Sequence, residues 1–302
     1  RLRLAAMAKR SPRGDKREKR TEKRQKVRDV YVPRPFAGLA DEAEWVALRE
    51  LVPAASAPLR LAPQLVAEAG ERSVVLATVL PMAWPAMHRA DGTIFIGLQR
   101  QVNSGDVSRD LAAALLSAVQ TAPGQPVAVP ALAGPGPRLQ DVLVTDAPLD
   151  VTLHDGFEFW LAADAGDDPR VKESMERANE SIYPTVRLSA APAAYWCQVP
   201  DKAHVRWALP DDEDPALDAL SRLGAADAIK LGDDTRFAGM FRTHGLLVPV
   251  WDLPRDTPAA DWDAPLAEFA KRYNEALAVD GPLTPAERRA RQGLVGRQLT
   301  LR

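Results

Sequence analysis

Proline is the feature that most constrains how this chain can fold. Twenty-six of the 302 residues are proline, and most of them lie between short apolar segments. Proline lacks a backbone N–H and restricts the residue before it, so it ends helices and interrupts strands. We therefore expect many short elements joined by rigid connections, rather than a few long helices or strands.

The apolar pattern between the prolines predicts an α+β body. Runs rich in β-branched or aromatic residues, typical of strands, occur at 74–80, 93–98, 157–161, 185–188, 194–199, 204–209 and 245–251. Helical spacing of apolar residues follows at 41–52, 107–119, 169–178, 214–223 and 263–277. Two helix starts resemble capping boxes, Asp41 with Glu44 and Thr284 with Glu287.

Shifts in composition divide the chain into five parts. We expect a disordered basic arm (1–29), a first α+β unit (30–121), a linker rich in proline and glycine (122–137), a second α+β unit (138–281) and a basic C-terminal helix and tail (282–302). The two units are similar in size, and both contain a strand hairpin followed by a helix. Two explanations of this similarity stay open: a degenerate repeat, or the fact that a hairpin followed by a helix is common in proteins.

Charge is distributed very unevenly along the chain. The first 28 residues contain thirteen basic and three acidic residues, a net charge of +10. Because the whole chain has 39 basic and 41 acidic residues, the remainder carries a net charge of −12. A basic segment on an acidic body is attracted to polyanions, since each contact with a phosphate releases condensed counterions.

This distribution predicts a polyanion-binding surface. Its predicted residues are Lys9, Arg10, Arg13, Lys16, Arg17, Lys19, Arg20, Lys23, Arg24, Lys26, Arg28, Arg288, Arg289 and Arg291. The leading hypothesis is a non-enzymatic accessory protein that docks on RNA, with the ribosome as a candidate. Two alternatives stay open: a basic arm that only keeps the chain soluble, and an adaptor linked to secretion that binds another protein.

Two pairs of residues are candidates for catalysis. Cys197 and His204 flank a turn at 200–201, and a two-residue turn would place them opposite each other on neighbouring strands, where histidine could activate the thiol. The alternative is that Cys197 is a small buried apolar residue. His154 and Asp155 could form a base and its orienting carboxylate, although adjacent residues of a strand point to opposite faces, and a turn is the competing interpretation.

Other classes of site lack support in the sequence. A single cysteine excludes a disulfide framework and a cysteine-built metal site, and no two histidines have the i,i+4 spacing of a helical metal site. Walker A, G-x-G-x-x-G and G-x-S-x-G motifs are absent. We therefore expect no cofactor and no metal. No apolar run is long enough to span a bilayer, and no secretory signal pattern follows the N-terminal charges, which predicts a cytoplasmic protein.

Several segments together resemble an actinobacterial family of unknown function. They are PRPFAGL (33–39), EWVALRELVPAA (44–55), ATVLPMAWPA (77–86), SGDVSRDLA (104–112), RLQD (138–141), AYWC (194–197), HGLLVPVWDLP (244–254) and RQLT (297–300). The resemblance covers nearly all of 33–302. It implies an actinobacterial cytosolic protein and carries no activity with it.

Some members of that family are labelled preprotein translocase SecA-like. The label is associated with a short, cysteine-rich, zinc-binding SEC-C motif near their N-terminus. This chain has no such motif, because lysine and arginine occupy the corresponding region. The ATP-binding motifs of the translocase motor are absent as well, so the resemblance implies no motor activity here.

Overall fold

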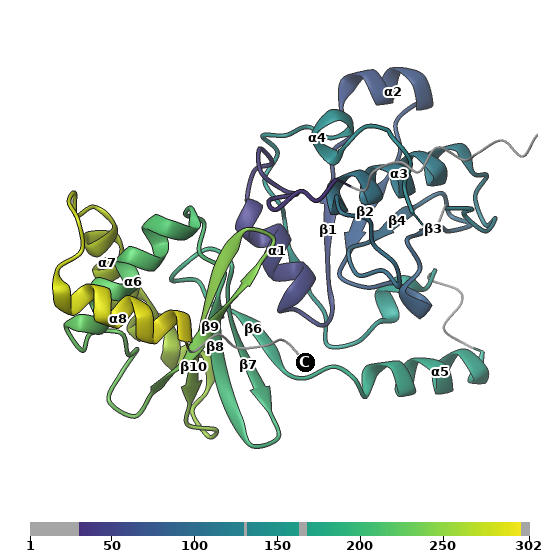
Figure 1. Ribbon diagram of the computed structural model, residues 1–302. Coiled ribbons are helices and arrows are strands. Elements are labelled where there is room, and N and C mark those ends of the chain that lie inside the picture. The colour runs from purple at the N-terminus through teal and green to yellow at the C-terminus, as the bar shows by residue number, and fades with distance from the viewer. Residues whose placement is uncertain (1–29, 130–131, 163–167, 297–302) are drawn as a thin grey trace, which may run out of the picture.

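The computed structural model describes residues 30–129, 132–162 and 168–296 and has an α+β fold. Its described strands form two five-stranded sheets, with orders β3-β4-β2-β1-β5 and β6-β7-β8-β10-β9. The first sheet is built from residues before 154 and the second from residues after 184. Figure 1 shows the two sheets with helix α1 between them, and helices α6, α7 and α8 beyond the second sheet.

The first sheet combines antiparallel and parallel pairing. Its strands are β1 (Ala55–Leu59), β2 (Val74–Ala77), β3 (Ala86–His88), β4 (Ile94–Gly97) and β5 (Thr152–Leu153). The hairpin expected between 74–80 and 93–98 is wrong, because β4 pairs with β2 in parallel; its antiparallel partner is β3, a strand that the sequence did not indicate. β5 pairs with β1, so residues on both sides of the segment 122–137 complete one sheet.

Helices cover one face of this sheet. They are α1 (Glu42–Glu50), α2 (Pro63–Ala69), α3 (Val107–Gln120) and α4 (Leu139–Val142). The amphipathic helix expected at 107–119 is confirmed as α3, and its N-cap residue Asp106 accepts a hydrogen bond from the Arg109 backbone N–H. Apolar residues of α1 and α3 pack on β1, β2 and β4 in the largest cluster of buried side chains.

A smaller aromatic cluster lies on the opposite face of the first sheet. The strand expected at 157–161 is wrong, because residues Glu158–Trp160 form a short 3-10 helix, η2. This turn stacks Trp160 on Phe157, with ring centroids 4.3 Å apart, and both rings pack beside Phe95 of β4. Helix α5 (Pro169–Asn179) begins after the N-cap Asp168, as expected, and adds Met175 to the edge of the cluster.

The second sheet is antiparallel throughout. Its strands are β6 (Thr185–Arg187), β7 (Ala194–Val199), β8 (Lys202–Trp207), β9 (Arg236–Thr243) and β10 (Leu246–Leu253). The expected strands at 185–188, 194–199, 204–209 and 245–251 are confirmed within a few residues. The strand order and the all-antiparallel pairing differ from those of the first sheet, so the topology lends no support to an internal repeat.

Three helices cover the outer face of the second sheet: α6 (Glu213–Ala225), α7 (Asp263–Leu277) and α8 (Pro285–Gly296). Figure 1 shows them packed together at that side of the molecule. The capping box expected at the start of α8 is confirmed, since Thr284 and Glu287 exchange side-chain to backbone hydrogen bonds.

Helix α1 is packed between the two sheets, and this position explains a second wrong expectation. Asp41 and Glu44 form no capping box: Asp41 accepts a hydrogen bond from the Leu149 backbone, and Glu44 is buried. Glu44 forms an ion pair with Arg187 of β6 and accepts a hydrogen bond from the Tyr195 hydroxyl of β7. A carboxylate expected to cap its own helix therefore links that helix to the second sheet.

The β9–β10 hairpin makes a second link to α1. Its two-residue turn, His244 and Gly245, has positive φ at both positions, as in a type I′ turn. The His244 ring lies 2.8 Å from a carboxylate oxygen of Glu50 and packs edge-on against Phe36. No helix among the described residues is long and apolar enough to cross a membrane.

Candidate functional site

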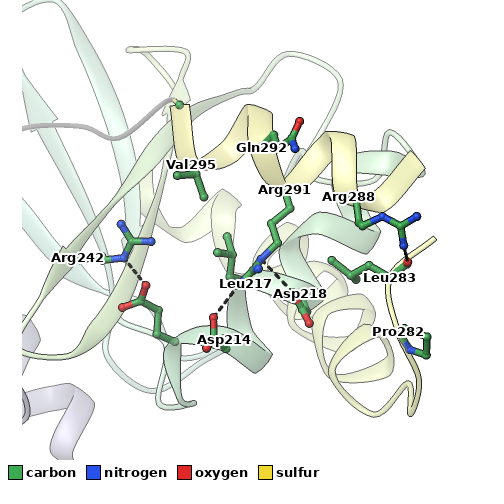
Figure 2. Close-up of a pocket in the computed structure, with 12 residues that line it drawn as sticks. Asp214, Leu217, Asp218, Arg242, Pro282, Leu283, Arg288, Arg291, Gln292 and Val295 are labelled. Atoms are coloured by element: carbon green, nitrogen blue, oxygen red, sulfur yellow. Dashed lines mark hydrogen bonds and ion pairs between the residues drawn. The ribbon is translucent and has the colours of Figure 1, made fainter. Parts of the chain in front are cut away.

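The predicted C-terminal basic residues lie on helix α8, beside a surface pocket of about 760 Å³. The pocket lies between α8, α6 and the end of β9, and its apolar lining includes Leu217, Leu283 and Val295. Figure 2 shows Arg291 reaching from α8 toward Asp214 and Asp218, while Arg242 lies across the pocket. Three arginines and three carboxylates therefore line one hollow, with polar groups around an apolar centre.

Each arginine in the pocket already has a protein partner. Arg291 lies 2.6 Å from Asp214 and 3.2 Å from Asp218, and Arg242 is paired with Glu213. The Arg288 guanidinium donates a hydrogen bond to the Leu283 carbonyl. The Asp214 side chain is 85% exposed, and exposed ion pairs contribute only about 0–1 kcal/mol each, so a phosphate could replace the carboxylate at little cost.

The same pairing extends over the described body. Arginines that form an ion pair with a carboxylate include Arg34, Arg49, Arg89, Arg138, Arg187 and Arg236. Arg289, in contrast, is exposed on α8. Eleven of the fourteen residues predicted to bind a polyanion, Lys9 to Arg28, lie outside the described residues. The positive charge of the described body is thus largely matched by its own acids.

The structure brings Cys197 and His204 together as the hairpin pattern predicts. They are directly paired across β7 and β8, and His204 is paired in turn with Asp252 of β10. His204 Nδ1 lies 3.0 Å from Asp252 Oδ1, so cysteine, histidine and aspartate form one row across the sheet. Burial raises the pKa of the Cys197 thiol, which keeps the sulfur protonated and makes it a poor nucleophile.

His154 has a partner that the sequence did not indicate. Its Nε2 lies 2.8 Å from the Ser56 hydroxyl, and its ring stacks on Phe159 with centroids 4.2 Å apart. Burial lowers the pKa of His154, while the negative charges of Asp155 and Glu158 act in the opposite direction. Asp155 therefore acts on His154 through its charge, and the hydrogen-bonded partner is Ser56.

Neither Ser56 nor Asp252 was among the residues singled out from the sequence. Ser56 is 98 residues from His154, and Asp252 is 48 residues from His204, so no local motif connects either pair. Asp252 comes beside His204 only through the pairing of β8 with β10, which the sequence did not indicate. No group of three or more metal-ligating side chains occurs within the described ranges.

Comparisons with known proteins place the chain in a family without assigning an activity. No curated protein and no solved structure matches it. One family model, described as a family of unknown function (DUF5926), matches residues 35–302. That match includes both sheets and every described helix. The chain therefore belongs to the DUF5926 family.

Proposed function

We propose that this protein is a non-enzymatic accessory protein that docks on RNA, with the ribosome as the candidate assembly, through its N-terminal basic arm. The observation that carries the proposal is the separation of charge, +10 in the first 28 residues against −12 in the remainder. A polyanion is attracted to the arm and repelled by the body, so the arm sets both affinity and orientation.

The ion pairs of the body support this assignment. An arginine held by a neighbouring carboxylate offers less net charge to a phosphate than an arginine without an acidic neighbour. The arm has thirteen basic residues and only three acids, so most of its charge is available. Exposed Arg288 and Arg289 on α8 are placed to add a second, weaker contact.

The dependence of RNA affinity on salt tests the proposal. The full chain is compared with a variant in which the eleven basic residues from Lys9 to Arg28 are replaced by glutamine, using a single-stranded RNA labelled for fluorescence anisotropy. For single strands, log K falls by about 0.7 per phosphate contact for each tenfold rise in salt. Loss of six contacts would therefore reduce the steepness of log K plotted against log salt concentration by about 4.

Two further variants serve as controls. A chain with the arm residues in scrambled order keeps the charge and should retain the affinity and the slope. The double variant Arg288→Gln and Arg289→Gln should change this slope by at most about 1.4, which corresponds to the loss of two phosphate contacts. If the glutamine arm binds RNA with an unchanged affinity and slope, the arm is not the RNA anchor and the proposal fails.

A further inference from the structure

Ser56 and His154 are positioned by two neighbouring strands. Ser56 of β1 is directly paired with Thr152 of β5, and His154 lies two residues beyond Thr152, on the same face. The backbone N–H of His154 donates a hydrogen bond of 3.0 Å to the Ala54 carbonyl, which extends the pairing by one more residue. The imidazole thereby lies over Ser56, with Nε2 2.8 Å from the hydroxyl oxygen.

The surroundings of the ring favour a neutral imidazole that can accept a proton. Stacking on Phe159 at 17° between ring planes excludes water from one face of the ring. Burial lowers the pKa of His154, so near neutral pH Nε2 can accept the hydrogen bond from Ser56. The charges of Asp155 and Glu158 would then stabilise the imidazolium formed by proton transfer. Asn179 holds Glu158 through a hydrogen bond of 2.7 Å.

A cavity of about 210 Å³ adjoins the imidazole. His154 and Asp155 line it together with apolar and aromatic side chains, including Leu153, Ile182 and Tyr183. Its volume equals that of about seven water molecules, which is enough for a short acyl chain. Ser56 is half-buried and is not itself among the lining residues; its hydroxyl is joined to the cavity through His154, whose Nε2 lies 2.8 Å away.

We propose that Ser56 and His154 form a nucleophile and general base that hydrolyse esters of small acyl groups, an activity that goes beyond docking on RNA and does not depend on it. The Ser56 hydroxyl oxygen bonds to the acyl carbon as its proton passes to His154 Nε2. The ester C–O bond then breaks, and Nε2 returns the proton to the departing alcohol. Water attacks the acyl-serine, transfers a proton through Nε2 to the serine oxygen, and releases the carboxylic acid.

Covalent labelling of the full chain tests this proposal. A fluorophosphonate probe reacts with an activated serine hydroxyl, and peptide mass mapping identifies the residue modified. We expect modification of Ser56, and a burst of nitrophenol from p-nitrophenyl acetate in proportion to the protein. In His154→Gln the amide can still bond to the hydroxyl but cannot take its proton, so labelling should slow about a hundredfold or more.

Matched variants keep the result interpretable. Ser56→Ala should remove the label and the burst, whereas Ser181→Ala, which changes a serine whose hydroxyl donates to the Ala178 carbonyl, should remove neither. Thermal unfolding of each variant verifies that it folds. The labelling rate should remain high below pH 6.5, the ordinary pKa of histidine, because burial lowers the pKa of His154. An unlabelled Ser56 in the folded chain, or equal labelling of His154→Gln, overturns the proposal.

Discussion

Replacing Gly245 with alanine should loosen the point at which the N-terminal segment joins the body. Gly245 has φ +77°, a conformation that costs alanine about 1 kcal/mol. A Cβ there would also overlap Cγ of Arg34 and lie 3.1 Å from the Pro33 carbonyl oxygen. Both the Arg34 side chain and the backbone of Pro33 must therefore move.

The magnitude follows from the contacts of Arg34. Its guanidinium donates hydrogen bonds of 2.9 and 2.6 Å to the half-buried Glu42, and loss of such a partly exposed pair costs about 1 kcal/mol. Displacement of the Pro33 carbonyl adds a cost of similar size, so the total is about 3 kcal/mol. For a chain of 302 residues, in which 1 kcal/mol shifts Tm by about 1.6 °C, Tm should fall by about 5 °C.

Gly92→Ala provides the matched control. Gly92 has φ +88°, but a Cβ there would meet no atom within 4 Å. Only the backbone strain remains, so the cost should be about 1 kcal/mol and the fall in Tm about 2 °C. Thermal unfolding followed by far-ultraviolet circular dichroism gives both values. If Gly245→Ala is no less stable than Gly92→Ala, the contact with Pro33 and Arg34 does not constrain the hairpin.

Two further predictions concern buried titratable groups. Burial raises the pKa of Glu44 against the effects of Arg187 and Tyr195, so protonation favours the folded state. The wild type should therefore gain stability relative to Glu44→Gln as pH falls from 8 to 5, as measured by the urea midpoints of unfolding. If the wild type instead loses stability relative to Glu44→Gln over this range, the prediction is wrong. Burial also raises the pKa of Cys197, so iodoacetamide at pH 8 should alkylate the folded chain at least about a hundredfold more slowly than the chain in urea, and equal rates would show an accessible thiol.

Local patterns in the sequence predicted the elements that depend on local physics. Strand β7 was expected at its observed bounds, and the two-residue turn after it fixes the pairing of Cys197 with His204. The starts of α3, α5 and α8 follow from side chains that cap their own helices.

The elements that were missed depend on distant partners. Strand β1, with sequence ASAPL, has small residues and a proline, and it becomes a strand because β2 and β5 pair with it on both sides. The aromatic run at 157–161 turns because stacking on Phe157 needs Trp160 three residues later. Ser56 was missed for the same reason, since its functional context comes only from the pairing of β1 with β5.

The most direct test of the central claim is sedimentation with ribosomes across a salt series. The full chain is compared with the variant in which the eleven basic residues of 9–28 are glutamine, because the two differ only in the charge of the arm. We predict that the full chain sediments with ribosomes at low salt, is released steeply as salt rises, and loses the association when these eleven charges are removed. Equal sedimentation of both chains, or of neither at any salt concentration, would contradict an arm that anchors the protein on RNA.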